Sequence, residues 1–395
     1  MAKTLVENET LRLEGPPHRI LGSGAFGTVF VARYLCGDGA WRPCALKVLA
    51  SEDAAAVDAE LDALAALPPH PNIVRLIGKS CSAAGKKVGI ATELLAGGSL
   101  HARLDEASRL GAPPPAEARL RWTDNVAAGL EVMHERGLVH GDVKSSNAVF
   151  DGAGPAAVLK LIDFGLVKAG EASFAGTLNH AAPELIPHSG RASVRTTKAD
   201  VYAWACLAYS VFSRREPFHE VLREFGTSTS KRLMLTREKD AAKLGVVGAL
   251  LRGDGGRKPL RPNLDDLEGA FTPPELPRLL ERCWQTDHAA RPTIAEVRAS
   301  LATMMGAATS PAAAPSFIQQ HIAMARMLLD RKKQELADCS ALCGELKHRV
   351  EERVSDASVS AMTHKTLSVL EAQLGTLAKR GAQLEASLVK LQLPK

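Results

Sequence analysis

Residues 140–147 read His-Gly-Asp-Val-Lys-Ser-Ser-Asn, and residues 163–165 read Asp-Phe-Gly. Asp142, Asn147 and Asp163 offer side-chain oxygens, the ligands that Mg²⁺ prefers, and such an ion can be held jointly with phosphate groups. The Asp142 carboxylate can also accept a proton from an incoming hydroxyl group. A lone Asp-Phe-Gly is a common accident. The prediction of a magnesium and phosphate site therefore depends on both stretches together and on two motifs upstream.

A glycine-rich stretch lies upstream at residues 22–29, which read Gly-Ser-Gly-Ala-Phe-Gly-Thr-Val. Glycines at this spacing let backbone amides approach phosphate oxygens without a clash from Cβ atoms. A dinucleotide-binding turn would need a helix directly afterwards, whereas residues 29–32 are apolar and predict a strand. We therefore expect a glycine-rich flap between two strands, with an ordinary hairpin as the alternative.

Lys47 lies within the apolar run Cys-Ala-Leu-Lys-Val at residues 44–48. A lysine in a buried strand is costly unless its charge is paired. Its useful partners would be nucleotide phosphates and a carboxylate from the helix that apolar spacing predicts at 54–67. Glu60 is the best candidate for that carboxylate and Glu52 is the second. A solvent-facing lysine on an edge strand is the alternative.

The predicted secondary structure changes character near residue 95. Apolar runs predict strands and short strands at residues 29–34, 44–49, 88–94, 148–150 and 158–162. The first three lie before residue 95, whereas the pattern between residues 100 and 301 is mainly helical. This order predicts a small sheet-rich lobe followed by a larger helical lobe.

With these motifs in place, residues 18–303 resemble a eukaryotic-type protein kinase domain of the tyrosine-kinase-like group of serine/threonine kinases. Further segments that carry the resemblance are His70–Val74, Thr92–Leu95, Ala182–Glu184, Asp200–Trp204, Cys283–Asp287 and Arg291-Pro292. The resemblance implies an α+β, bilobal protein kinase fold. Its β-rich N-lobe would span 18–95 and its helical C-lobe 96–303. It also implies an ion pair between Arg291 and Glu184.

The resemblance implies that the cofactors are ATP and Mg²⁺. Residues expected to contact the nucleotide are Gly22, Ser23, Gly24, Ala25, Phe26, Gly27, Val29, Ala45, Lys47, Thr92, Glu93 and Leu95. Among them, Thr92 resembles a gatekeeper, and the backbone groups of Glu93 and Leu95 would face adenine.

Catalytic roles are carried over in the same way. Lys47 would hold the α- and β-phosphates and pair with Glu60, while Asp142 would orient and deprotonate the substrate hydroxyl. Lys144 would reach the γ-phosphate, as in serine/threonine kinases, and Thr177 would bond both Asp142 and Lys144. Asn147 and Asp163 would bind Mg²⁺.

Two departures from the family pattern stand out. The arginine that usually precedes the catalytic aspartate is Gly141 here, and that arginine normally reads a phosphate on the activation loop. Control by loop phosphorylation is therefore not expected, although Ser173 and Thr177 could be modified. Residues 179–181 read Asn-His-Ala where tyrosine or tryptophan is commoner, which leaves the substrate preference open.

Two other functions were weighed against a protein kinase. His-Gly-Asp also resembles small-molecule phosphotransferases of the aminoglycoside and choline kinase type, but these lack the segments seen here at 182–184 and 291–292. A pseudokinase scaffold acting through the C-terminal tail is the second alternative. It is disfavoured because the full set of charged and polar site residues is present: Lys47, Glu60, Asp142, Asn147 and Asp163.

Composition indicates which partners and which cellular compartment to expect for the protein. The net charge of +5, from 49 basic and 44 acidic side chains, gives no support for nucleic-acid binding. Seven cysteines without a Cys-x-x-Cys pair predict free thiols in a reducing compartment. No apolar run reaches the roughly 20 residues that a transmembrane helix needs. We therefore expect a cytoplasmic kinase that acts on serine or threonine of protein substrates.

Outside the kinase-like region, residues 1–17 are expected to form an N-terminal extension and residues 304–316 a linker of proline and alanine. Residues 317–395 are predicted to be helical. From Leu367 to Leu391 apolar residues recur at alternating spacings of three and four, interrupted at Gly381, which is typical of a coiled-coil seam. The tail would form an intrachain helical hairpin or an intermolecular coiled coil, and so mediate self-association or bind a partner helix.

Overall fold

The computed structural model describes the two lobes and isolated positions of the tail. The described residues are 3–6, 11–14, 18–24, 27–49, 54–81, 88–154, 156–167, 171–172, 177–186, 193–220, 241–309 and scattered positions between 333 and 383. Residues 1–105 and 116–306 form one compact unit, and residues 106–115 and 307–395 form a second.

The N-terminal lobe is a seven-stranded sheet with one helix. Its elements are β1 (Lys3–Val6), β2 (Leu11–Leu13), β3 (Ile20–Gly24), β4 (Gly27–Leu35), β5 (Trp41–Leu49), α1 (Ala54–Ala66), β6 (Leu76–Cys81) and β7 (Val88–Glu93). The strand order is β1-β6-β7-β5-β4-β2, and β3 pairs with β4. Buried residues on adjacent strands, among them Ala32, Cys44 and Ala91, pack together in this lobe.

The sheet is wider than the sequence analysis predicted. The predicted N-terminal extension, residues 1–17, supplies two of its strands: β1 pairs in parallel with β6, and β2 pairs with β4. Strand β6 follows residues 70–74, which resemble the segment that joins the regulatory helix to the next strand, but its bounds were not predicted. Strands β1, β2 and β6 exist because neighbouring strands provide hydrogen-bonding partners.

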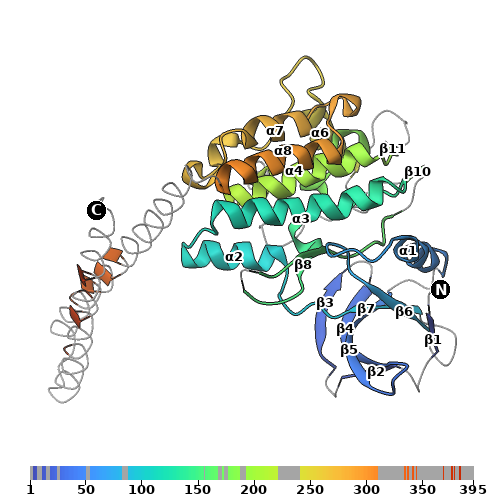
Figure 1. The fold of residues 1–395 in the computed structure, drawn as a ribbon. Helices are drawn as coiled ribbons and strands as arrows, with labels where there is room; N and C mark the ends of the chain where they lie inside the picture. Colours follow the sequence, from blue (N-terminus) through green and yellow to red (C-terminus); the bar gives the residue numbers. More distant parts are fainter. Residues whose placement is uncertain are drawn as a thin grey trace, which may run out of the picture. The chain divides into compact units, whose positions relative to one another are not determined.

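The C-terminal lobe is mainly helical. Its longer helices are α2 (Leu100–Leu110), α3 (Ala116–His134), α4 (Thr197–Ser213), α6 (Ala241–Arg252), α7 (Leu276–Cys283) and α8 (Ile294–Thr309). Its short strands are β8 (Ala148–Phe150), β9 (Leu159–Leu161), β10 (Glu171–Ala172) and β11 (Ser193–Val194). The α+β, two-lobed architecture is therefore confirmed (Figure 1).

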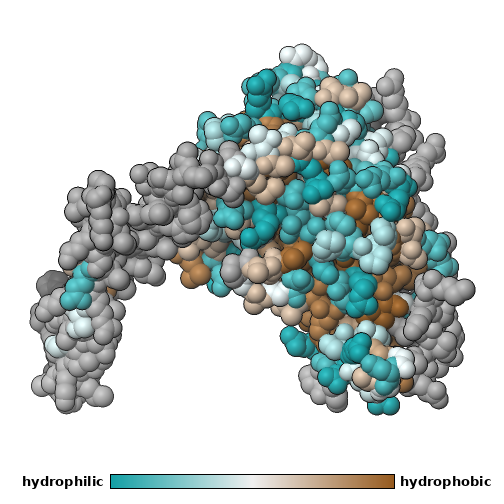
Figure 2. All heavy atoms as spheres, in the orientation of Figure 1, coloured by the Kyte–Doolittle hydropathy of each residue, from teal (hydrophilic) through white to brown (hydrophobic). Residues whose placement is uncertain are grey.

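Helix α4 is the central element of this lobe. Residues 199–213 are all buried, as expected for a helix that is apolar on every side and surrounded by protein. It packs against α3 and α7, and Figure 1 shows it running between neighbouring helices. Figure 2 shows that polar residues cover most of the visible face of this lobe, whereas apolar residues gather over the sheet.

The far end of the kinase-like region departs from the predicted boundary. Helix α8 continues to Thr309, so residues 304–309 are helical and not linker. The described tail positions between 333 and 383 are helical, but the choice between hairpin and coiled coil lies outside the described residues.

No helix among the described residues is both long and apolar enough to cross a membrane. The cysteines described are free thiols: Cys36, Cys44, Cys206 and Cys283.

A buried ion pair joins distant parts of the helical lobe. Arg291 is only 1% exposed, and its two terminal nitrogens donate to the two carboxylate oxygens of Glu184 at 2.7 and 2.8 Å. The same guanidinium donates to the carbonyls of Gln285 and Lys198. The predicted pair is confirmed, and its planar fork ties residues 182–184 to the start of α4.

We predict that Glu184→Gln lowers the free energy of unfolding by about 3 kcal/mol, because it leaves the Arg291 charge buried without its counterion. Asp38→Asn is the matched control, since Asp38 pairs with Arg42 where both side chains are more than half exposed. Its cost should stay below about 1 kcal/mol. Thermal denaturation of both variants is the measurement. Equal shifts would show that the buried pair contributes no more than an exposed one.

Candidate active site

A cleft of about 450 Å³ lies where the sheet faces the helical lobe, and it gathers most of the predicted nucleotide-binding residues. The predicted residues that line it are Gly22, Ser23, Gly27, Val29, Ala45, Lys47, Thr92, Glu93 and Leu95. Gly24 lies at the end of β3, paired with Gly27. Ala25 and Phe26 fall outside the described residues. Glu60, Lys144, Asn147 and Asp163 line the same cleft.

The glycine-rich stretch forms a flap of two antiparallel strands. Gly22 pairs with Val29, and Gly24 pairs with Gly27 across the turn. Gly27 has a backbone φ of +143°, which favours glycine. A Cβ atom placed on Gly22 would meet nothing within 4 Å, so a ligand can come close to this backbone. The strand–turn–strand form is as predicted, because β4 follows where a dinucleotide-binding turn would have a helix.

Lys47 joins two carboxylates from separate parts of the chain. Its Nζ lies 2.9 and 3.0 Å from the Glu60 oxygens on α1 and 2.6 Å from Asp163 Oδ1. Burial opposes the lysine charge, but attraction to Asp163 and Glu60 outweighs it and raises the pKa of Lys47. Burial likewise raises the pKa of Glu60, which is 5% exposed, despite Lys47. Glu60 is thus bonded to Lys47, as expected, whereas Glu52 lies outside the described residues.

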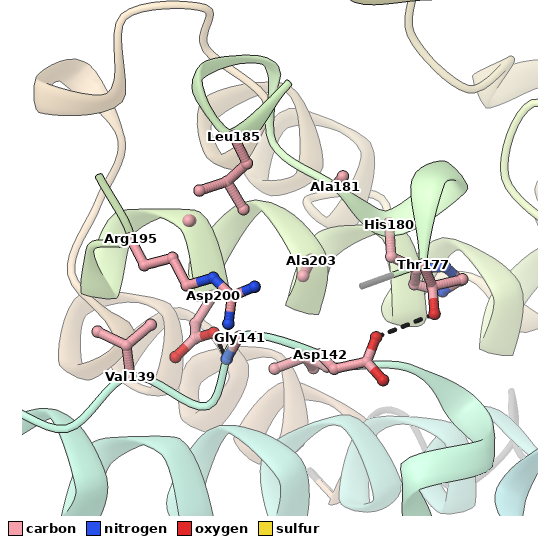
Figure 3. A pocket seen from close by; sticks show the side chains of 12 residues that line it. Val139, Gly141, Asp142, Thr177, His180, Ala181, Leu185, Arg195, Asp200 and Ala203 are labelled. Atoms are coloured by element: carbon pink, nitrogen blue, oxygen red, sulfur yellow. Dashed lines mark hydrogen bonds between the residues drawn. The ribbon is translucent and has the colours of Figure 1, made fainter. Parts of the chain in front are cut away.

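Residues 140–147, which carry Asp142, form the predicted catalytic loop. The Asp142 carboxylate is the most heavily hydrogen-bonded group in it. It accepts bonds from Lys144 Nζ, from Thr177 Oγ1 at 2.9 Å and from Asn147 Nδ2 at 2.9 Å. Lys144 Nζ also donates to Thr177 Oγ1 at 2.7 Å, so the predicted triangle is confirmed; Figure 3 shows the Asp142–Thr177 bond. Burial would raise the pKa of Asp142, but Lys144 and Thr177 outweigh it and hold the pKa below its ordinary value. The group is therefore an ionised carboxylate.

The two predicted metal ligands keep oxygens that suit a hard cation. Asn147 uses its side-chain nitrogen to donate to the carbonyl and the carboxylate of Asp142, which leaves its side-chain oxygen for another partner. Asp163 shares one oxygen with Lys47 and has a left-handed backbone with φ +66°, an arrangement that persists only where the surroundings enforce it. Both residues line the cleft. A carboxylate and an amide oxygen fit Mg²⁺.

Asp200 binds the backbone of the catalytic loop just before Asp142. This role of Asp200 was not predicted from the sequence. Its carboxylate is 1% exposed and accepts the backbone N–H groups of His140 and Gly141 at 2.8 and 2.9 Å and a bond from the His134 ring at 2.9 Å. A signal was available, since a lone carboxylate in an apolar helix must be paired. The His140 ring in turn packs 5.4 Å from Phe164, between ring centroids.

One expectation for the adenine site needs correction. The backbone N–H of Glu93 donates to the carbonyl of Arg75 at 3.0 Å, so it is not available to a ligand. The Glu93 side chain accepts bonds from Lys160 Nζ at 2.7 Å and from the Arg75 N–H at 2.9 Å. Of the Glu93 backbone groups, only the carbonyl could face a nucleotide. Arg75 directly precedes β6, which pairs with β7.

The fold and this site define a two-lobed phosphotransfer architecture, and comparison with known families agrees. Residues 17–301 match the family model of the protein kinase domain. The chain belongs to the protein kinase domain family, which confirms the resemblance identified in its motifs. Members of this family in general use ATP and a divalent metal ion.

Individual relatives of the chain are named as kinases. Human "Mitogen-activated protein kinase kinase kinase 7" is 28% identical over 285 residues, 70% of this chain and 40% of the relative. "Probable serine/threonine-protein kinase drkD" of Dictyostelium discoideum is 29% identical over 291 residues, 70% of this chain and 19% of the relative. A rice "L-type lectin-domain containing receptor kinase S.7" is 37% identical over 172 residues, 41% and 23% of the two chains. The chain spans less than half the length of each.

We predict that Lys47→Met destabilises the protein more at about pH 8 than at about pH 5. Without the lysine, the already raised pKa of Glu60 rises further. A carboxyl group whose pKa is raised by folding stabilises the folded state at low pH, and that contribution is lost as the pH rises. The melting temperature at each pH is the measurement.

Two controls define this test. Lys79→Met should show no such trend, because Lys79 pairs with the half-exposed Asp58. In Lys47→Met/Glu60→Gln the pH dependence should disappear. A deficit for Lys47→Met that is the same at both pH values would mean that Glu60 does not respond to the lysine.

Proposed function

We propose that this protein is a serine/threonine kinase that transfers the γ-phosphoryl group of ATP to protein hydroxyl groups with the aid of Mg²⁺. The observation that carries the proposal is that Lys47, Asp163 and Asn147 line the same cleft as Lys144, whose ammonium group bonds the Asp142 carboxylate. Phosphoryl transfer requires mainly that its participants be positioned and that negative charge be stabilised.

Asp142 acts on the substrate hydroxyl. Its pKa lies below the ordinary range, so it is ionised at neutral pH but is a weak base. We infer that it orients the hydroxyl by accepting its hydrogen bond, and takes the proton as the new bond to phosphorus forms. Lys144, bonded to the same carboxylate, places a positive charge next to the transferred phosphoryl group.

Lys47 and the cation site act on the nucleotide. Lys47 is held by Glu60 from the sheet side of the cleft and can turn its charge to the α- and β-phosphates. When bound through Asn147 and Asp163, Mg²⁺ would neutralise charge on the phosphate oxygens. The flap around Gly22 and Gly27 supplies backbone N–H groups to the same phosphates.

The preference for serine or threonine rests on two residues and on relatives. Lys144 and Thr177 form the pattern that resembles serine/threonine kinases, and one of the relatives above carries that activity in its name. A pseudokinase scaffold is the other candidate. The charged groups of the site do not favour a scaffold. Lys47 is bonded to Glu60 and Asp163, and Asp142 to Lys144, as catalysis would require.

We predict that Asp163→Asn lowers phosphorylation of a generic basic protein, or of the kinase itself, at least about 100-fold, because it removes a ligand charge from the nucleotide site. The fold should remain, since the side chain keeps its shape. Asp265→Asn, an exposed carboxylate outside the cleft, is the matched control. If the wild type is no more active than Asp163→Asn, the scaffold explanation holds.

We also propose that activity does not depend on a phosphate in the activation loop, because Gly141 has no side chain to read one. Treatment with a phosphatase should therefore change kcat by less than about twofold, since no charge-assisted contact is lost. The assay compares treated and mock-treated enzyme, with loss of phosphate checked by mass. A tenfold loss would mean that another basic group reads a phosphate.

For the tail we propose self-association through the seam between Leu367 and Leu391. Two stripes of apolar residues can be buried together when two chains pair. We predict that the full chain sediments as an assembly of at least about two copies and that deletion after Thr309, which keeps α8 whole, gives a single copy. An unchanged number of copies would instead favour a hairpin within the chain.

A further inference from the structure

The backbone at Gly141 leaves no room for a side chain. Its φ is +78°, a conformation that glycine adopts without strain. A Cβ atom built there would lie 2.9 Å from the Nη1 atom of Arg195, 3.2 Å from the carbonyl oxygen of Leu166 and 3.4 Å from the Leu166 Cβ. The place next to the catalytic Asp142 is therefore occupied by the guanidinium of Arg195, a residue 54 positions later in the chain.

Arg195 lies between β11 and α4 and is 8% exposed. Its Nη1 donates a hydrogen bond to the carbonyl oxygen of Leu166 at 2.9 Å. Figure 3 shows its side chain reaching over Gly141, beside Asp200 and toward the catalytic loop. One side chain thus spans three segments: the entry to α4, the loop that carries Asp142 and the segment that follows Asp163.

The positive charge of the Arg195 guanidinium is attracted by two carboxylates, those of Asp200 and Asp142. Burial lowers the pKa of Arg195, and attraction to Asp200 and Asp142 opposes that shift. Asp200 already accepts the N–H groups of His140 and Gly141. A buried cation keeps its place only where carboxylates and hydrogen bonds compensate it, so Arg195 and the catalytic loop constrain each other.

The bond to Leu166 lies close to the metal-binding end of the cleft. Leu166 is three residues after Asp163, and the N–H of Val167 donates to the carbonyl of Phe164 at 3.1 Å, so residues 164–167 form a turn. A guanidinium that holds the carbonyl inside this turn restrains the strained backbone of Asp163. Lys47 and Glu60 come from the opposite lobe but are joined to this stretch, since Lys47 bonds Asp163 and Glu60 accepts a backbone hydrogen bond from Phe164.

We propose that Arg195 is a positioning residue: from the segment before α4 it supplies the cation that the catalytic loop lacks at Gly141, and it holds the turn after Asp163 in the arrangement needed for phosphoryl transfer without a phosphate. This inference rests on the proposed kinase activity. It predicts that positions 141 and 195 are coupled, because only one of them can fill the space between Asp200 and Leu166.

The first experiment measures kcat, the KM for ATP and hydrogen exchange of the amides in residues 163–167. Arg195→Met should lower kcat at least about tenfold and leave the KM for ATP within about twofold, because positioning is lost while the nucleotide site remains. Exchange in residues 163–167 should become faster. Arg195→Lys should recover part of the lost kcat. Arg257→Met, an exposed arginine, is the control and should match the wild type.

The second experiment tests the coupling. Gly141→Arg alone should lose activity, because its side chain meets Arg195 and Leu166. Gly141→Arg/Arg195→Met should be more active than Gly141→Arg, since the contact with Arg195 is gone, while the φ of +78° keeps it below the wild type. Equal or lower activity of the double variant would overturn the coupling, as would an Arg195→Met enzyme with wild-type kcat and exchange.

Structural and functional failures are separable. Faster exchange across the whole domain in Arg195→Met, together with parallel loss of kcat and nucleotide binding, would reduce Arg195 to a structural residue and overturn the proposal. If Arg195→Met is insoluble, Arg195→Lys decides by the same readouts. An inactive wild type would refute the proposed kinase activity, while hydrogen exchange, which needs no catalysis, would still test whether Arg195 holds residues 163–167.

Discussion

The buried carboxylate of Asp200 is the constraint on which the catalytic loop depends. It projects from α4, the helix that the C-terminal lobe surrounds, and binds two consecutive backbone N–H groups just before Asp142. Burial would raise the pKa of Asp200, but bonds from His134 and the loop outweigh it and lower the pKa. The loop is thus fixed to a helix whose residues 199–213 are all buried. Removing any one of these donors would leave a charge in the core with no water to compensate it.

The second organising feature is the ion pair between Lys47 and Asp163, because it crosses from the sheet to the helical lobe. The two residues are 116 positions apart, and each belongs to a different lobe. Lys47 is supported by α1 through Glu60, and Asp163 by the turn over residues 164–167 and by Arg195. The cleft between the lobes is therefore lined by charges from both of its sides that meet at this ion pair, as a reaction governed by positioning requires.

Much of the fold and site could be predicted because the relevant signals are local. Glycine spacing, a lysine in a strand and the order of Asp142, Asn147 and Asp163 are properties of short stretches, and each side chain has few chemical uses at its position. The pairs Lys47–Glu60 and Arg291–Glu184 followed once those stretches were recognised. Strands β1 and β2 were missed, and the bounds of β6 were not predicted, because the formation of these strands depends on neighbours in the sheet. The bond from the Glu93 N–H to Arg75 depends on such neighbours as well. No local pattern marks Arg195, whose importance arises only when residue 141 has no side chain.

Gly141 lies between Asp200 and Arg195 and contacts both. The N–H groups of Gly141 and His140 both donate to Asp200, and the missing Cβ of Gly141 admits a guanidinium to the same place. A loop arginine at this position would be a movable charge whose effect depends on what it binds. Arg195 is instead buried, bonded to Leu166 and placed among carboxylates. We infer that the exchange of an arginine for glycine replaces a charge that can respond to a covalent signal with one that is built into the fold.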